Sequence, residues 1–455
     1  QGNISEAVKY YQYFIDQGFK DDRVFIKYGI ILTNLGKLKE AELLTRKAIE
    51  LNPNFGYFHF NLGNILRDIG RLEDAEISFR KAIDLDPNNP YGNYNLGRIL
   101  IDLGKLQEAE IATRKAIKLK PDYADAYSTL GSILQDIGKL QEAELSLRKA
   151  IKINPDFVEA HCNLGTIFQE LGKLKEAEIS YRKVIELKPD FADAHSNLGN
   201  IFQELGKLKE AEVYTRKAIE INPTNEEVNH NLSLILLKSN NFKEGFERYE
   251  SRWKIKANNK PFIRNKPEWT PIRRGRVLLW AEQGIGDEIL FASLIPELVK
   301  TVDQLIVQVD PRLIPLFKRS FDKGIIYIQK NQRILEEKYD FQIPMGSVLR
   351  YLRDGKASFN KGKKKYLKVN ERKTIIFRDK ILKDSKKKKI VGISWISKST
   401  SHKGKSIPLE KFILGIYSPN VCFLNLQYGD TKDETNKIKT KHNIDIFDLK
   451  EVDNF

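Results

Sequence analysis

The chain has 455 residues, of which 41% are hydrophobic and 30% charged, and its formal net charge at pH 7 is +16. No apolar run is long enough to cross a bilayer, and the printed residues contain no signal peptide. The two cysteines, Cys162 and Cys422, exclude a disulfide framework and offer no metal-ligand spacing, as is typical of a reducing compartment. The default expectation is therefore a cytoplasmic protein without a metal site.

The charge is divided unevenly along the chain. Residues 1–260 contain 38 basic and 38 acidic residues, so the whole excess of +16 lies in 261–455. An excess of this kind suits an anionic ligand such as a phosphate or a sugar nucleotide, or else a nucleic acid or a membrane surface. The two halves are therefore expected to differ in function.

The first half repeats with a period of 34 residues. Prolines recur at this spacing, at Pro53, Pro87, Pro121, Pro155, Pro189 and Pro223. Leu-Gly pairs do the same, ending at Gly63, Gly97, Gly131, Gly165 and Gly199, and a second glycine follows each pair seven residues later. The first glycine lets two helices approach closely, the second permits a turn, and the proline ends the second helix. A 34-residue helix–turn–helix unit with these marks is identified as a tetratricopeptide repeat (TPR), whose units stack into a superhelix.

The complete repeats are predicted at 22–55, 56–89, 90–123, 124–157, 158–191 and 192–225. A half repeat precedes them, because Gly2, Ala7, Tyr11 and Phe14 fit the second helix of a unit whose first helix is missing. From this and from Gln1 we expect the printed sequence to enter the array midway. A degenerate unit at 226–253, with Ser233 in the glycine position, is expected to end an array domain of 1–253.

A different pattern begins after a predicted linker at 254–275. The apolar run 277–281 is typical of a buried parallel strand, and a glycine loop (283–287) and a helical stretch (288–300) follow it. Further strands are expected at 305–309, at 325–328 and near Phe341, with helices at 311–320 and 347–353. This alternation predicts a first Rossmann-like α/β domain at 276–358 with a parallel sheet.

A lysine-rich segment at 359–388 is predicted to be a solvated linker and helix; a polybasic contact with a membrane surface or a nucleic acid is the alternative. Strands are then expected at 390–395, 421–426 and 444–447, with helices beginning at Pro408 and near residue 431. Three strands and two helices make half of a second Rossmann-like domain. We therefore expect 389–455 to be a truncated domain.

The second half resembles the bacterial heptosyltransferase-like domains that occur behind TPR arrays, and the whole chain is similar in organisation to O-GlcNAc transferase-like proteins of the B-type glycosyltransferase fold. The resemblance rests on 280–288 (WAEQGIGDE), on 392–395 (GISW) with 405–408 (KSIP), and on 425–430 (NLQYGD). It implies transfer of a sugar from a nucleotide-sugar substrate, with no metal or other cofactor.

The resemblance implies that Asp287 is the general base that takes the proton from the acceptor hydroxyl. A dinucleotide fingerprint is a weak interpretation of the same loop, because Ile289 occupies the third glycine position. The structural alternative is that Asp287 caps the following helix. Catalysis and capping do not exclude one another.

The resemblance also implies a donor site in the second sheet. Ser397 and Lys405 match the residues that hold the donor phosphates, in a loop rich in hydroxyls and cations; a merely solvated basic loop is the alternative. Gln427, Tyr428 and Gly429, after the next strand, are expected to contact the nucleotide. Glu434 is expected to reach the ribose hydroxyls.

Asparagines recur at the sixth position of successive repeats, with Thr129 interrupting the series, at Asn61, Asn95, Asn163, Asn197 and Asn231. In O-GlcNAc transferase-like arrays such a ladder grips a peptide backbone, since an amide pairs with both N–H and C=O. The alternative is that these amides only solvate the inner face. The histidines at the fourth position, His59, His161 and His195, are expected to be packing residues.

Two functions from different classes follow. The first is a glycosyltransferase whose acceptor is a protein or peptide recruited by the repeats. The second is a non-catalytic interaction scaffold with a degenerate transferase-like domain. Nucleic-acid binding comes third, because the charge permits it but no recognition motif is found.

Overall fold

The computed structural model describes residues 4–255, 265–361, 365–385, 389–395, 407–427 and 430–448. The chain divides into two compact units, Gln1–Asn258 and Asn259–Phe455. The first unit is helical throughout its described residues, and the second contains two small parallel sheets. Each unit is described by itself.

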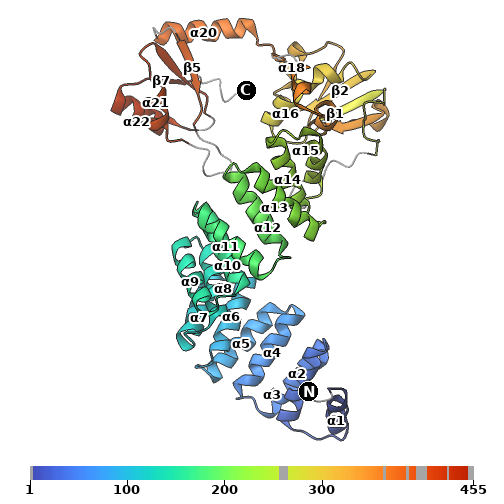
Figure 1. Cartoon of the computed structure of the whole chain (residues 1–455), viewed down its shortest axis with the longest axis vertical. Coiled ribbons are helices and arrows are strands. Elements are labelled where there is room, and N and C mark those ends of the chain that lie inside the picture. Colours follow the sequence, from blue (N-terminus) through green and yellow to red (C-terminus); the bar gives the residue numbers. More distant parts are fainter. Residues whose placement is uncertain are drawn as a thin grey trace. The chain divides into compact units, whose positions relative to one another are not determined.

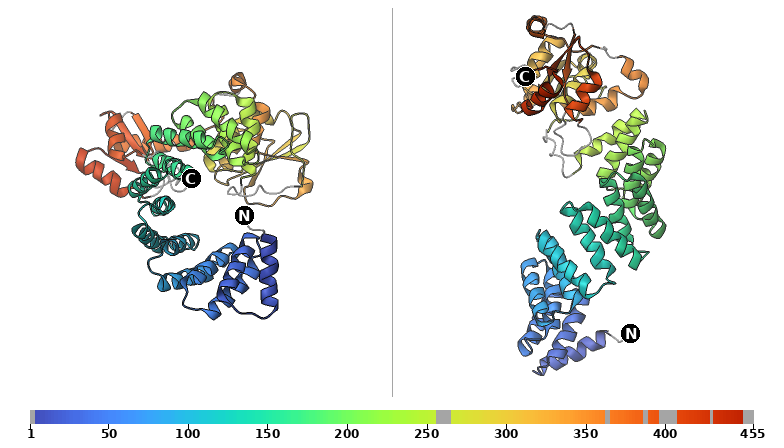
Figure 2. Two further views of the ribbon diagram at one scale, coloured as in Figure 1. Left: turned by 60° about the horizontal axis from the view of Figure 1, so that its bottom comes forward. Right: turned by 90° about the vertical axis from the view of Figure 1, so that its left-hand side faces the viewer.

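The first unit is a curved stack of helical hairpins (Figures 1 and 2). A single helix, α1 (Ile4–Asp16), comes before the first complete pair. The first helices of the pairs are α2 (Asp22–Asn34), α4 (Gly56–Ile69), α6 (Pro90–Asp102), α8 (Ala124–Asp136), α10 (Val158–Glu170), α12 (Ala192–Glu204) and α14 (Glu226–Lys238). The second helices are α3 (Leu38–Leu51), α5 (Leu72–Leu85), α7 (Leu106–Leu119), α9 (Leu140–Ile153), α11 (Leu174–Leu187), α13 (Leu208–Ile221) and α15 (Phe242–Tyr249), which continues into a 3₁₀ turn at Glu250–Trp253. The hairpin array expected from the 34-residue period is confirmed.

The turn inside each hairpin needs a left-handed residue. Gly172, for example, has φ +71°, and its amide donates to the carbonyl of Gln169. In the degenerate unit this position is taken by Asn240, with φ +65°. Asparagine tolerates the left-handed region better than most other residues, so the last hairpin keeps the turn without glycine.

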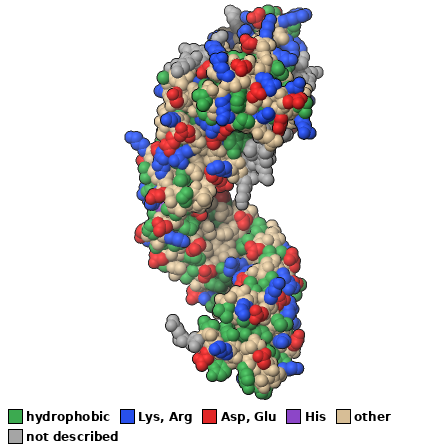
Figure 3. Space-filling model, turned by 90° about the vertical axis from the view of Figure 1, so that its right-hand side faces the viewer, with side chains coloured by type: hydrophobic (Ala, Val, Ile, Leu, Met, Phe, Trp, Pro, Cys, Tyr) green, Lys and Arg blue, Asp and Glu red, His purple; other side chains and the backbone are tan. Residues whose placement is uncertain are grey.

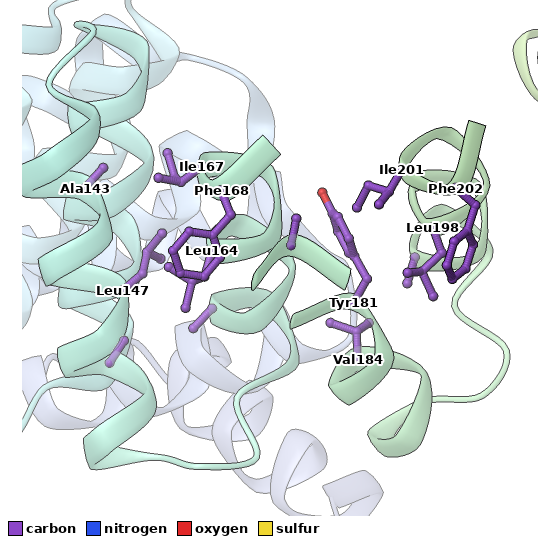
Figure 4. Close-up of a cluster of buried hydrophobic side chains, with 14 of the residues drawn as sticks. Ala143, Leu147, Leu164, Ile167, Phe168, Tyr181, Val184, Leu198, Ile201 and Phe202 are labelled. Carbon is purple, nitrogen blue, oxygen red and sulfur yellow. The ribbon is translucent and has the colours of Figure 1, made fainter. Parts of the chain in front are cut away.

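The core of the array runs between the two helices of each pair and on into the next pair (Figure 4). Leu147, Tyr181 and Phe202 are fully buried there. A Cβ placed on Gly165 would lie 2.8 Å from the ring of Tyr181, so the glycine is required by close helix approach. Successive first helices also contact one another, as α8 does α10 and α12 does α14. The first helices therefore line the inner side of the curve.

The first sheet of the second unit has the strand order β3-β2-β1-β4, with all pairs parallel. Its strands are β1 (Arg276–Trp280), β2 (Gln304–Val309), β3 (Ile326–Gln329) and β4 (Phe341–Pro344). The helices are α16 (Ile285–Phe291), α17 (Ile295–Leu298), α18 (Ile314–Ser320) and α19 (Leu349–Leu352). The helical stretch expected over 288–300 is broken into α16, a 3₁₀ turn and α17, with Pro296 in the first turn of α17.

Trp269, within the segment expected as a linker, is fully buried against this sheet. Its backbone N–H donates to the carbonyl of Gln342 at 2.9 Å, and its indole N–H donates to the carbonyl of Arg273 at 3.1 Å. The ordered α/β unit therefore includes residues before β1.

The second sheet is β5-β6-β7, also parallel, formed by β5 (Lys389–Ile393), β6 (Val421–Asn425) and β7 (Ile446–Asp448). Its helices are α20 (Glu371–Ser385), α21 (Leu409–Ile416) and α22 (Lys432–His442). Ile393, Ile413, Phe423 and Ile438 form its core. The fold class expected for the second half is confirmed at this level: an α/β region with two small parallel sheets.

Candidate functional site

The inner side of the helical array carries the asparagine ladder. Asn61, Asn95, Asn163, Asn197 and Asn231 lie on α4, α6, α10, α12 and α14, and all five are half-buried. Their spacing puts them on the same side of each first helix, one helix turn from the polar residues at the ninth position of the repeats. The five predicted residues thus lie in one row across five hairpins.

Hydrogen bonds hold these amides in place. Asn61 and Asn95 donate from Nδ2 to the carbonyls four residues earlier in their own helices, at 2.7 and 2.9 Å. Asn163 and Asn231 instead donate across the repeat boundary, to Ser132 Oγ at 3.1 Å and Asn200 Oδ1 at 3.3 Å. Asn95 Oδ1 also accepts from Arg67 Nη1 at 3.3 Å. An amide has two N–H groups and two lone pairs, so one or two such bonds leave hydrogen-bonding capacity for a ligand.

Asn197 lies beside a buried phenol. Burial raises the pKa of Tyr181 to about 12, and hydrogen bonds with Thr166 and Asn197 act in the opposite direction. The Tyr181 hydroxyl is 2.9 Å from Thr166 Oγ1. This amide therefore also contributes to the packing of the array.

An acidic row that the sequence reasoning missed follows the ladder. One carboxylate stands near the end of each of five first helices, and all are exposed: Asp68, Asp102, Asp136, Glu170 and Glu204. Each lies at the thirteenth position of its repeat, seven residues after the ladder position, so it shares that helix face. Glutamines bind two of these acids across the repeat boundary, Gln135 to Glu170 at 2.6 Å and Gln169 to Glu204 at 3.2 Å. The 34-residue spacing of these acids was the signal that could have found them.

The histidines of the fourth position are structural in the repeats. The Nε2 atoms of His59, His161 and His195 lie 2.8–2.9 Å from the carbonyl oxygens of Pro53, Pro155 and Pro189. Each ring thus ties a first helix to the turn that precedes it. In the described residues, no three His, Cys, Asp or Glu side chains are grouped so that they could hold a metal ion.

Asp287 lies at the carboxyl edge of the first sheet. The N-cap of α16 is Gly284, and Asp287 is a half-buried residue in the first turn of that helix. The alternative that Asp287 is the capping residue is therefore wrong, because the helix begins three residues earlier than the capping interpretation requires. β1 lies between β2 and β4, so the loop before α16 is at the point where the strand order reverses. Ligands of open α/β sheets bind at such a point.

The acidic residues next to Asp287 form hydrogen bonds or ion pairs within the α/β unit. Glu288 is only 2% exposed; it accepts the backbone N–H of Asp310 at 2.8 Å and forms an ion pair with Lys330 at 2.9 Å. Lys330 also donates to the carbonyl of Gln283 at 2.6 Å. Glu282 accepts the backbone N–H of Gly346 at 2.9 Å, linking the ends of β1 and β4. Asp287 is thus one of several half-buried acids at the edge, with Glu282 and Asp310, and Glu288 is a fully buried one, which sequence spacing could not identify.

The predicted donor residues are only partly described. Ser397, Lys405, Tyr428 and Gly429 lie outside the described residues. Gln427 is buried, and its Oε1 accepts from the backbone N–H of Trp395 at 2.9 Å and from Ser394 Oγ at 3.0 Å. The amide therefore ties the end of β6 to the end of β5.

Glu434 is exposed in the first turn of α22 and accepts the indole N–H of Trp395 at 2.5 Å. It also lines a surface cavity of about 760 Å³ together with Pro408, Glu410 and Lys441. Lys441 and His442 both bind Glu410 at 2.7 Å, and these hydrogen bonds hold the pKa of Glu410 below its usual value. The structure brings Gln427 and Glu434 together around Trp395.

In the described part of the chain, no helix has the length and apolar character that a membrane span requires. Both cysteines are free thiols.

The helical unit matches family models for tetratricopeptide repeats. Models described as "Tetratricopeptide repeat" match residues 22–55, 44–77, 90–123 and 192–225. A model described as "TPR repeat" matches 63–104, 131–172 and 165–206. No glycosyltransferase family is detected.

Among curated proteins, the chain is 27% identical over 240 residues to protein FlbA of Caulobacter vibrioides; the match covers 48% of this chain and 40% of FlbA. Similar solved structures include YrrB, described as a TPR protein with an unusual peptide-binding site (27% identity, 41% of this chain and 96% of YrrB, TM-score 0.36). MamA is another (30% identity, 36% of this chain and 97% of MamA, TM-score 0.35). The chain is therefore a tetratricopeptide-repeat protein over roughly its N-terminal 250 residues.

Proposed function

We propose that this chain is a protein-interaction scaffold whose repeats bind an extended segment of a partner protein along the first helices. The observation that carries the proposal is the row of five half-buried asparagines at one position of the repeats. Side-chain amides can pair with the N–H and C=O groups of an extended backbone whatever its sequence. Each such pair would contribute about 0.5–1.5 kcal/mol.

The acidic row specifies the chemistry of the partner. Exposed carboxylates such as Asp102 and Asp136 stand seven residues from the ladder position on the same helix face. Opposite charges across an interface favour encounter and fix register. The segment bound by the ladder is therefore one that carries lysine or arginine.

The test uses peptides selected from a random phage-displayed library on the full chain. We expect enrichment of basic residues in the selected peptides. The triple variant Asn163→Ala, Asn197→Ala, Asn231→Ala should bind them at least about tenfold more weakly, as measured by fluorescence anisotropy. The matched control is Lys39→Ala, Lys175→Ala, Lys209→Ala, three exposed residues near the starts of second helices, which should leave affinity unchanged. Equal affinity of the ladder variant and wild type would reject the proposal.

We also propose, as a second function, that the α/β unit binds a nucleotide-sugar and transfers the sugar, with Asp287 as the base. The strand order β3-β2-β1-β4 supports it, because Asp287 lies at the edge where that order reverses. Ser397, Lys405, Gln427, Tyr428, Gly429 and Glu434 would serve the donor.

Titration calorimetry of the chain with a panel of nucleoside diphosphates and their sugars tests this second function. Saturable binding of one nucleotide is expected, and Asp287→Asn should abolish transfer while leaving that binding in place. Absence of binding to every member of the panel would leave the scaffold as the proposed function.

A further inference from the structure

A second row of side chains marks the opposite side of the repeats. A large apolar residue stands exposed at the same position of the second helix in each of the six complete repeats: Leu43, Ile77, Ile111, Leu145, Ile179 and Val213. We call these six residues the outer row. Their exposed fractions are 57–69%, although residues next to them, such as Ala75 and Leu147, are completely buried. The outer row is therefore apolar without contributing to the core.

The row is confined to the complete repeats. At the same position of α1 the residue is Lys9, and at the same position of α15 it is Glu247; both are exposed. Charged residues thus replace the apolar ones in the helices on either side of the six complete repeats, and the outer row is limited to those repeats within the described residues.

Charges flank the outer row in the same way in every repeat. An acid lies three residues before each apolar residue: Glu40, Asp74, Glu108, Glu142, Glu176 and Glu210. A lysine lies four residues after it: Lys47, Lys81, Lys115, Lys149, Lys183 and Lys217. Residues three and four apart are neighbours on a helix surface, so an acidic row and a basic row run on either side of the apolar one. Figure 3 shows acidic and basic side chains interspersed over the surface of the array.

A groove next to the row provides space for an apolar side chain. It has a volume of about 630 Å³, and its lining includes Ile151 of α9, Leu164 and Phe168 of α10, and Ile179 of α11. Ile179 is thus both a member of the outer row and part of the groove wall. Apolar side chains projecting beside an apolar groove are the two halves of a self-complementary contact.

We propose that the outer row is the interface between two copies of this chain. A two-fold axis parallel to the row would place the acidic row of one copy against the basic row of the other, because this rotation reverses the helix direction. A two-fold axis along the helices would instead oppose lysine to lysine. The charge pattern therefore selects antiparallel packing of the second helices.

The apolar area suits a dimer that forms reversibly with concentration. Six side chains of this size, each about two-thirds exposed, present on the order of 700 Å² in total. Because the row lies on the outer side of the curve, two copies touch along part of it, and the contact is smaller than the roughly 800 Å² that each partner buries in a standard-size interface. The inner side of the array, with its asparagine ladder, stays accessible in such a dimer.

Sedimentation velocity of the full chain over a range of concentrations tests the proposal. Wild type should dimerise, and Ile111→Glu with Leu145→Glu should raise the dissociation constant by at least about a hundredfold, since each charge would be buried twice in the symmetric contact. The matched control is Leu35→Glu, an apolar residue that is 51% exposed in a turn outside the row, which should not change association. A monomeric wild type, or a dimer insensitive to the double substitution, would overturn the proposal.

A charge exchange tests the packing direction. Lys115→Glu with Lys149→Glu should weaken self-association, and so should Glu108→Lys with Glu142→Lys, the acids of the same two repeats, in a second preparation. A mixture of the two should form heterodimers, because each acidic face then meets a basic one. Failure of the mixture to associate, with both variants folded by circular dichroism, would overturn the two-fold arrangement.

Discussion

The two units are stabilised by contacts of different reach along the sequence. In the array, side-chain bonds join neighbouring repeats, as Arg80 to Glu108 and Lys105 to Glu76 do over 28 and 29 residues. In the first sheet they span far more, 64 residues from Arg276 to Asp340 and 62 from Trp280 to Gln342. Each repeat is thus stabilised by contacts with its neighbours in the sequence, whereas the sheet forms only when segments far apart in the sequence come together.

The largest effect expected from this difference is at Trp269. Trp269→Ala should lower the free energy of unfolding of the α/β unit by about 3–5 kcal/mol, because it empties a fully buried site beside the sheet. Calorimetry should show the transition of that unit shifting while the transition of the array is unchanged. Ile272→Ala, at a residue that is 92% exposed, is the control. A common shift of both transitions would contradict this prediction.

A smaller loss is expected where two helices touch inside the array. Gly165→Ala should destabilise it by about 1–3 kcal/mol, since the new methyl group would overlap the Tyr181 ring. Gly415→Ala is the matched substitution in α21, where no atom lies within 4 Å of the added Cβ. It should be neutral or stabilise by up to about 1 kcal/mol. Urea unfolding followed by circular dichroism measures both, and equal effects would contradict the role of close helix approach.

The free energy of unfolding is expected to depend on pH through His230, in the last hairpin of the array. Burial, and then the charge of Arg252, holds the pKa of His230 below 6.5, and the Nδ1 atom of this histidine is buried without a hydrogen-bond partner in the described structure. The unfolded chain therefore binds this proton more readily than the folded chain does, and stability should fall as the pH drops below about 6.5. Chemical denaturation at several pH values should show that His230→Gln removes this part of the slope. An unchanged slope would assign the pH dependence to other groups.

The smallest effect on stability is expected at Thr45 and Thr113, two threonines at the same position of different repeats. Thr45 Oγ1 donates to the carbonyl of Ala41 at 2.8 Å, whereas Thr113 Oγ1 is buried without a partner in the described structure. Thr45→Val should cost about 1 kcal/mol, and Thr113→Val should be neutral or stabilising by a fraction of that. Thermal denaturation of the two variants gives the comparison. A larger loss for Thr113→Val than for Thr45→Val would contradict it.

Much of the array could be predicted from the sequence because each repeat specifies its own turns. Gly172 predicts the turn inside one hairpin, and Pro155 predicts the end of a second helix. Because these residues recur every 34 positions, the same prediction holds for each complete repeat. Asn240 shows the limit of this reasoning, since its left-handed conformation preserves a turn where the glycine is absent. The asparagine ladder was also predictable, because one helix face is fixed by spacing.

The α/β unit was less predictable because its site residues meet only in the folded chain. The capping alternative for Asp287 was wrong because the start of α16 depends on how β1 ends, and Gly284 takes that position. The roles of Glu288 and Gln427 could not be foreseen either. Glu288 accepts a hydrogen bond from Lys330, which lies 42 residues away in the sequence, and Gln427 accepts one from the backbone N–H of Trp395, which lies 32 residues away.

The sequence by itself determined the period, the hairpins, the inner row of asparagines and the presence of a parallel α/β region, because these depend on residues within one repeat or one strand–helix step. Only the tertiary structure decided which acidic side chain at the sheet edge is buried and that Trp269 belongs to the core. It also decided that the outer row remains exposed. These properties depend on which surfaces meet, and a surface is buried only when segments distant in the sequence pack against it.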